Sequence, residues 1–125
     1  MLKIKRIYDP VSQTDGKRIL VDRLWPRGVS KEAAKIDEWL REIAPSNELR
    51  TWFGHEPDKW PEFQKRYQQE LKGRGDTIER LRRAAKKGAV TLLFSAKDAE
   101  RNNAVVLRDV IARQSSRAGV LRKAA

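Results

Sequence analysis

Residues 88–98, Gly-Ala-Val-Thr-Leu-Leu-Phe-Ser-Ala-Lys-Asp, contain the stretch that decides the fold. The run from Ala89 to Phe94 is short and apolar, and it directly follows a glycine that can end a helix. A run of this kind is typical of a strand that is covered on both faces, as strands of parallel sheets are. We therefore expect residues 89–94 to form the central, buried strand of an α/β domain.

Two further strands are predicted nearer the N-terminus, over residues 2–8 and 18–22, with an Asp15-Gly16 turn signal between them. The connection over residues 9–17 is shorter than the roughly ten to twelve residues that a parallel crossover usually takes. From the residues alone, either a minimal parallel crossover or an antiparallel hairpin fits. In a hairpin, Tyr8 and Asp9 would lie away from the edge where the other two strands end.

Helical spacing of apolar residues, together with capping residues, Pro and Gly, predicts about five helices. Their expected spans are 30–44, 46–54, 58–72, 76–88 and 98–113. The fold class expected is α/β, with a small, mostly parallel sheet of about three or four strands packed with these helices. We expect one domain over residues 1–113 and a flexible basic tail over residues 114–125.

The composition excludes several classes of protein. The 125 residues include 28 Lys and Arg against 17 Asp and Glu, one His and no Cys. Disulfides, thiolate metal sites, cysteine nucleophiles and multi-histidine metal sites are thereby excluded, so we expect no metal and no cofactor. Since no apolar run is long enough to span a bilayer and the N-terminus lacks signal-peptide features, we expect a cytoplasmic protein without a membrane partner.

Polar and charged side chains follow each predicted strand. They are Tyr8 and Asp9 after the first, Asp22, Arg23, Trp25 and Arg27 after the second, and Ser95, Lys97, Asp98 and Asn102 after the third. Ligands of open α/β sheets bind at the carboxyl ends of the strands, so we expect a shared pocket there. Arginine and lysine side chains in such a pocket favour an anion.

The hypothesis that follows is binding of a phosphate- or carboxylate-bearing small molecule, such as a nucleotide. In it Arg23 and Arg27 clamp the anion, Lys97 adds a point charge, Trp25 stacks on a ring, and Asp22 and Asp98 orient the cations. If the ligand is turned over, Asp22 is the candidate general base, and whether the protein is an enzyme stays open. The alternative is that these charges pair with one another and hold a loop in place.

A second hypothesis places function on the basic residues of the helix expected over 76–88. Arg80, Arg82, Arg83, Lys86 and Lys87, together with the basic tail, favour a nucleic-acid-binding or regulatory protein. The structural interpretation is a solvated helix face whose cations suit the C-terminal end of the helix dipole. A third hypothesis is an interaction module in which the whole charged motif is structural.

Several blocks of the sequence resemble the YeaO-like family of uncharacterised bacterial proteins, domain of unknown function 488. The resemblance rests on KRIYDP, DGKRILVDRLWPRGVSK and TLLFSAKDAERNNAVVL, and it covers about residues 3–112. It implies a compact α/β domain, a bacterial cytoplasmic setting and parallel first strands, and it implies no activity. The motif positions by resemblance are Tyr8, Asp9, Asp22, Arg23, Trp25, Pro26, Arg27, Gly28, Lys97, Asp98 and Asn103. More distant relatives have Cys and Glu where this chain has Phe94 and Ala96, so thiol chemistry does not carry over.

Overall fold

The computed structural model describes the backbone of residues 1–124 and the side chains of residues 1–113. Within this part of the chain, four parallel strands form one sheet in the order β1-β4-β2-β3. Their bounds are Leu2–Arg6 for β1, Lys17–Leu20 for β2, Glu38–Trp39 for β3 and Val90–Phe94 for β4. The predicted α/β class with a mostly parallel sheet is confirmed.

The strand β4 is central, as predicted, and all five of its residues are buried. It pairs with β1 along its whole length and with β2 on its other side. The first two strands are therefore parallel without being neighbours, and the hairpin alternative is wrong. The connection crosses the start of β4, where the Thr91 hydroxyl donates to the Asp15 carbonyl (2.7 Å) and the Lys17 N–H donates to the Ala89 carbonyl (2.9 Å).

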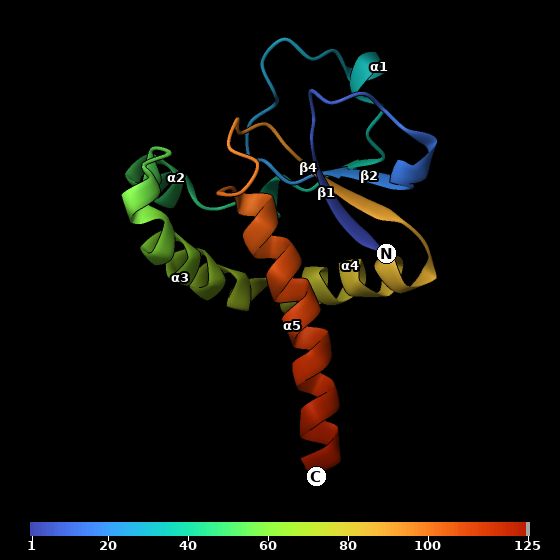
Figure 1. Ribbon diagram of the computed structural model, residues 1–125, viewed down its shortest axis with the longest axis vertical. Coiled ribbons are helices and arrows are strands. Elements are labelled where there is room, and N and C mark those ends of the chain that lie inside the picture. Colours follow the sequence, from blue (N-terminus) through green and yellow to red (C-terminus); the bar gives the residue numbers. More distant parts are fainter. Residues whose placement is uncertain (125) are drawn as a thin grey trace.

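The larger helices pack against one face of the sheet, and Figure 1 shows α3, α4 and α5 together on that side. The helices are α1 (Lys31–Ala34), α2 (Asn47–Phe53), α3 (Trp60–Leu71), α4 (Gly75–Lys87) and α5 (Asn103–Ala124). Because α1 is a single turn of 4 residues, the described part of the chain has four helices longer than this, slightly fewer than predicted. Ile19, Leu92 and Phe94 of the sheet share this core with α2 to α5.

The helix predicted over residues 30–44 is wrong. α1 ends at Ala34, the C-cap residue Lys35 adopts a left-handed conformation (φ 46°), and the chain then extends to form β3. The Asp37 carboxylate accepts a hydrogen bond from the Arg18 backbone N–H, and the Asp37 N–H donates to the Arg18 carbonyl, both at 2.8 Å. This segment therefore completes the edge of β2. The apolar stripe divides between both sheet faces, with Trp39 on one and Leu40 on the other, because successive strand residues alternate.

The other face of the sheet is covered by the loop between β2 and β3, which carries α1. Trp25, Val29 and Ile36 of this loop pack with Leu20 and Leu93 of the sheet. Among the helices that the structure describes, none combines the length and the apolar character required to cross a bilayer. The flexible basic tail predicted over residues 114–125 falls on side chains outside those described and stays a prediction.

Candidate functional site

A cavity of about 250 Å³ lies at the carboxyl edge of the sheet, where β2 and β4 end and where α2 and α5 approach them. We call it the Asp22 cavity. Its polar lining comes from three separate parts of the chain. The polar lining residues are Asp22 and Arg23 after β2, Arg50 and His55 in and after α2, and Ser95, Arg101, Asn102 and Asn103 between β4 and the first turn of α5.

Asp22 ties the end of β2 to the end of β4 and the start of α5. Its Oδ2 accepts hydrogen bonds from the backbone N–H (2.8 Å) and the hydroxyl (2.6 Å) of Ser95, and its Oδ1 accepts one from the Asn103 amide (3.2 Å). Burial raises the pKa of the Asp22 carboxyl above its usual range, although these hydrogen bonds act in the opposite direction. The floor of the cavity is thus a partly buried, well-bonded carboxylate.

The start of α5 is fixed by two asparagines. The side-chain oxygen Oδ1 of Asn102 accepts from the Val105 N–H (3.1 Å), so Asn102 caps the helix, and its side-chain Nδ2 donates to the Asp98 backbone carbonyl (2.9 Å). Asp98, where the sequence predicts this helix to begin, lies in the preceding turn, so the expected start of the helix is wrong. There the N–H groups of Glu100 and Arg101 hold the pKa of the Asp98 carboxyl below its usual range.

The three arginines of the cavity differ in how far their charges are already engaged. Arg23 donates to the backbone carbonyls of Pro45 (3.1 Å) and Ala44 (3.2 Å), and Arg101 pairs with Asp98 at 3.2 Å. Arg50 makes one long hydrogen bond, to Asn47 Oδ1 at 3.4 Å, and its charge acts to lower the pKa of Asp22. Of the three, Arg50 is therefore the guanidinium best placed to bind a guest.

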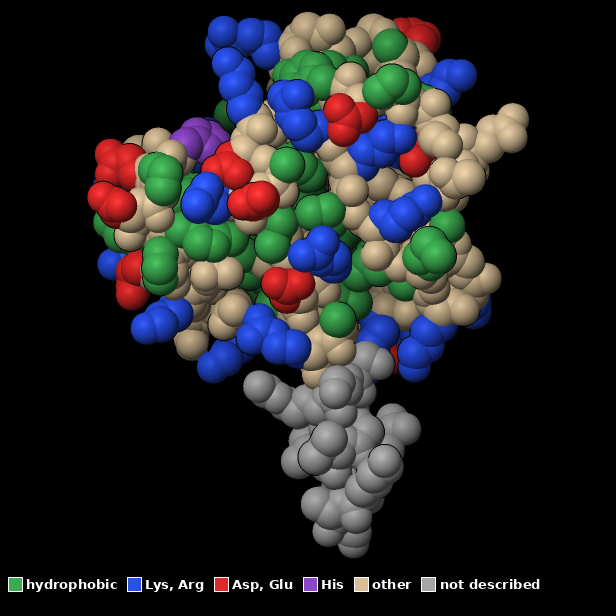
Figure 2. Space-filling view, viewed as in Figure 1, with side chains coloured by type: hydrophobic (Ala, Val, Ile, Leu, Met, Phe, Trp, Pro, Cys, Tyr) green, Lys and Arg blue, Asp and Glu red, His purple; other side chains and the backbone are tan. Residues whose placement is uncertain are grey.

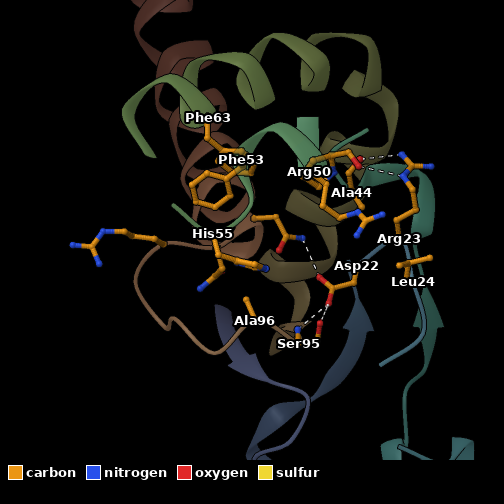
Figure 3. A pocket seen from close by; sticks show the side chains of 14 residues that line it. Asp22, Arg23, Leu24, Ala44, Arg50, Phe53, His55, Phe63, Ser95 and Ala96 are labelled. Atoms are coloured by element: carbon orange, nitrogen blue, oxygen red, sulfur yellow. Dashed lines mark hydrogen bonds between the residues drawn. The ribbon is translucent and has the colours of Figure 1, made fainter. Parts of the chain in front are cut away.

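His55 lies at the exposed rim of the same cavity. It follows the Gly54 C-cap of α2 and has a left-handed backbone (φ 59°), an uncommon conformation for a residue with a side chain. Its ring lies 6.0 Å from that of Phe53. Figure 3 shows Arg50 and His55 facing Asp22 and Ser95 across the cavity.

The structure brings four of the sequence-predicted site residues into the Asp22 cavity: Asp22, Arg23, Ser95 and Asn102. The others lie outside its lining. Trp25 donates to the Val29 carbonyl (2.6 Å) and packs edge-on against Trp39, as a core residue does. The other predicted residues outside the lining are Tyr8, whose hydroxyl donates to the Arg27 carbonyl (2.8 Å), and Asp9, Arg27, Lys97 and Asp98.

Sequence reasoning missed Arg50, His55 and Arg101, and it reached Asn103 only through the family resemblance. Arg101 and Asn103 flank the predicted Asn102, so a wider window after β4 would have included them. Arg50 and His55 belong to α2 and its C-terminal turn, far from any strand end. Nothing in the sequence indicates that this helix reaches the edge of the sheet.

The basic residues of α4 are largely paired with glutamates. Arg80 forms a two-pronged pair with Glu38 (3.0 and 2.9 Å), which lowers the pKa of that carboxyl, and Arg82 and Arg83 both pair with Glu79. Lys86 and Lys87 are exposed in the last turn, and the whole arrangement has the features of a solvated helix face. Figure 2 shows Lys and Arg side chains spread over the visible face among acidic ones.

The structure offers no evident metal site: within the side chains it describes, no group of three or more His, Asp or Glu residues could hold a metal ion.

Comparison with known proteins confirms the resemblance seen in the sequence. A family model described as "Inactive DUF488-N3 subclade" matches residues 1–124. The uncharacterized protein YeaO of Escherichia coli is 48% identical over 108 residues, which cover 86% of this chain and 94% of that protein. The uncharacterized proteins Mb3100c of Mycobacterium bovis and Rv3073c of Mycobacterium tuberculosis are each 36% identical over 110 residues, 88% of this chain and 92% of theirs. No solved structure matches significantly.

Proposed function

Since the chain belongs to the family described as the inactive DUF488-N3 subclade, we propose that it binds a small phosphate- or carboxylate-bearing molecule in the Asp22 cavity without turning it over. The observation that carries the proposal is the charge of the lining. Three arginines and one aspartate line the cavity, and the aspartate already accepts three hydrogen bonds. A guest anion would therefore meet more cationic than anionic groups.

The start of α5 supports the same ligand. Asn102 and Asn103 line the cavity, so the positive end of the α5 dipole faces it. An anion bound near Arg50 would gain from this field as well as from the guanidinium. The field and the guanidinium act in the same direction, and both would be weakened by salt.

Binding without turnover fits the state of Asp22 better than general-base catalysis does. A general base needs a free lone pair that faces the proton it abstracts. The carboxylate of Asp22 has about four lone-pair sites, and three of them already accept hydrogen bonds, two on Oδ2 from Ser95 and one on Oδ1 from the Asn103 amide. These bonds make Asp22 a residue that positions β2, β4 and α5 around the cavity.

Titration of the full chain with inorganic phosphate, followed by backbone amide NMR at fixed ionic strength, tests the proposal. We expect saturable shifts centred on Ser95, Asn103 and His55. Arg50→Gln removes a charge-assisted hydrogen bond to the anion and should lower the affinity for phosphate at least about tenfold. Arg27→Gln is the matched control, because it removes an exposed arginine outside the cavity lining and should leave affinity unchanged.

Two results would refute the proposal. One is the absence of any saturable shift in the wild-type chain. The other is an equal loss of phosphate affinity in Arg27→Gln and Arg50→Gln, which would place the anion outside the Asp22 cavity.

A further inference from the structure

Part of the wall of the Asp22 cavity is apolar. Phe53 and Phe63, whose ring centroids stack 4.4 Å apart, line it together with Leu24, Ala44, Pro45 and Ala96. Figure 3 shows the two phenylalanines on the other side of the cavity from Asp22 and Ser95. Phe53 and Phe63 are themselves buried in the core, so a simple inorganic anion would use the cationic groups and leave uncovered mainly the exposed apolar lining residue, Leu24.

Leu24 adds an exposed apolar side chain to the cavity lining, and Figure 3 shows it beside Arg23 and Asp22, away from the two phenylalanines. Its side chain lines the cavity and is 58% exposed, which makes it one of the most exposed large apolar residues among those described. An exposed leucine is unremarkable alone, but apolar surface beside a polar cavity is typical of a ligand site. A guest with an apolar part would cover Leu24 and gain from its burial.

The size of the cavity suits a guest larger than inorganic phosphate. About 250 Å³ exceeds the roughly 150 Å³ of an apolar cavity that holds one benzene molecule. Inorganic phosphate would leave most of this space to solvent, whereas a single ring that carries one anionic group would occupy more of it.

We propose that the natural guest of the Asp22 cavity is a small aromatic anion, an aryl phosphate or aryl carboxylate. Its ring lies against Leu24 and Phe53, and its anionic group reaches Arg50. This inference rests on the proposed function and narrows its ligand class to anions that carry an aromatic ring.

The test compares phenyl phosphate with inorganic phosphate on the full chain at about pH 8, where both are mainly dianions. We expect phenyl phosphate to bind at least about tenfold more tightly, because its ring is buried. Leu24→Ser should lower the affinity for phenyl phosphate at least about threefold and leave the affinity for inorganic phosphate unchanged. Val11→Ser, which alters an exposed apolar residue outside the cavity, is the matched control and should change neither affinity.

The possible failures are distinct. Equal affinities for the two phosphates, or an advantage that survives Leu24→Ser intact, would overturn the aromatic ligand class while the proposed anion site stands. Failure of both compounds to bind would overturn the proposed function, and this inference with it.

Discussion

Removing the carboxylate of Asp15 would leave a buried arginine without its counter-charge. Asp15 is 3% exposed and Arg18 is 4% exposed, and they pair at 2.6 Å. The same guanidinium donates to the Ala34 carbonyl (2.9 Å), and Lys5 approaches Asp15 at 3.1 Å. This cluster joins β1, β2 and α1 beneath the loop that covers the second face of the sheet.

The expected loss of stability in Asp15→Ala is large. Breaking a buried pair by removing one partner costs about 3–5 kcal/mol, because the remaining charge stays desolvated. For a domain of this size each kcal/mol lowers the melting temperature by about 4 °C, so the expected fall is about 12–20 °C. Urea unfolding and thermal melting measure it. Glu62→Ala, which breaks the half-exposed Glu62–Arg66 pair, is the control and should cost less than about 1 kcal/mol.

The pH dependence gives the prediction a second readout. Burial raises the pKa of Asp15, but the bonds from the Ser12 N–H, Lys5 and Arg18 outweigh it, and the net pKa is lowered. A lowered folded-state pKa gives stability that is present above the unfolded value of about 4 and is lost as pH falls through the folded value. The gap between wild type and Asp15→Ala should therefore be constant near neutrality and narrow in acid. A gap below about 1 kcal/mol at neutral pH would refute the reasoning.

Two further changes test the turn before β2 and the floor of the cavity. Gly16→Ala should cost more than about 2 kcal/mol in urea unfolding, because Gly16 has φ 63° and an added Cβ would lie 2.2 Å from the Ala89 carbonyl oxygen; a neutral result would contradict the packing described. Ser95→Ala should cost about 1–2 kcal/mol at neutral pH and less near pH 4, since it removes a 2.6 Å donor and raises the already raised pKa of Asp22. The cost is larger at neutral pH because a carboxyl whose folded-state pKa is raised stabilises the fold in acid, and this stability is lost as pH rises through the folded-state pKa. An equal cost of Ser95→Ala at both pH values would contradict this reasoning.

Much of the sheet could be predicted because β4 is buried on both faces. A strand in that position consists of consecutive apolar residues, and no other segment of the chain has such a run directly after a glycine. The strand order could not be predicted, since placing β4 between β1 and β2 depends on contacts such as Thr91 to Asp15 between distant residues. Sequence spacing alone left a hairpin open for the same reason.

The segment 30–44 shows why apolar spacing can mislead. Ile36, Trp39, Leu40 and Ile43 fit a helical stripe, but the same residues also suit a short strand followed by a 3-10 turn at Arg41–Ile43. The strand is favoured over a continued helix because the Arg18 guanidinium donates hydrogen bonds to the carbonyls of Ala34 and Lys35 and so fixes the end of α1. A tertiary contact of this kind overrides local propensity.

Some residues of the candidate site could be predicted from the sequence and others could not. The distance of each residue from a strand end explains the difference. Asp22 and Ser95 follow their strands within two residues, so the sheet itself brings them to 2.6 Å from each other. Arg27 lies further along a loop that turns toward the opposite face of the sheet, where Trp25 and Val29 are partly buried. The polar floor was thus within reach of sequence reasoning, whereas the cation best placed to bind, Arg50, comes from a helix whose position only the packed core determines.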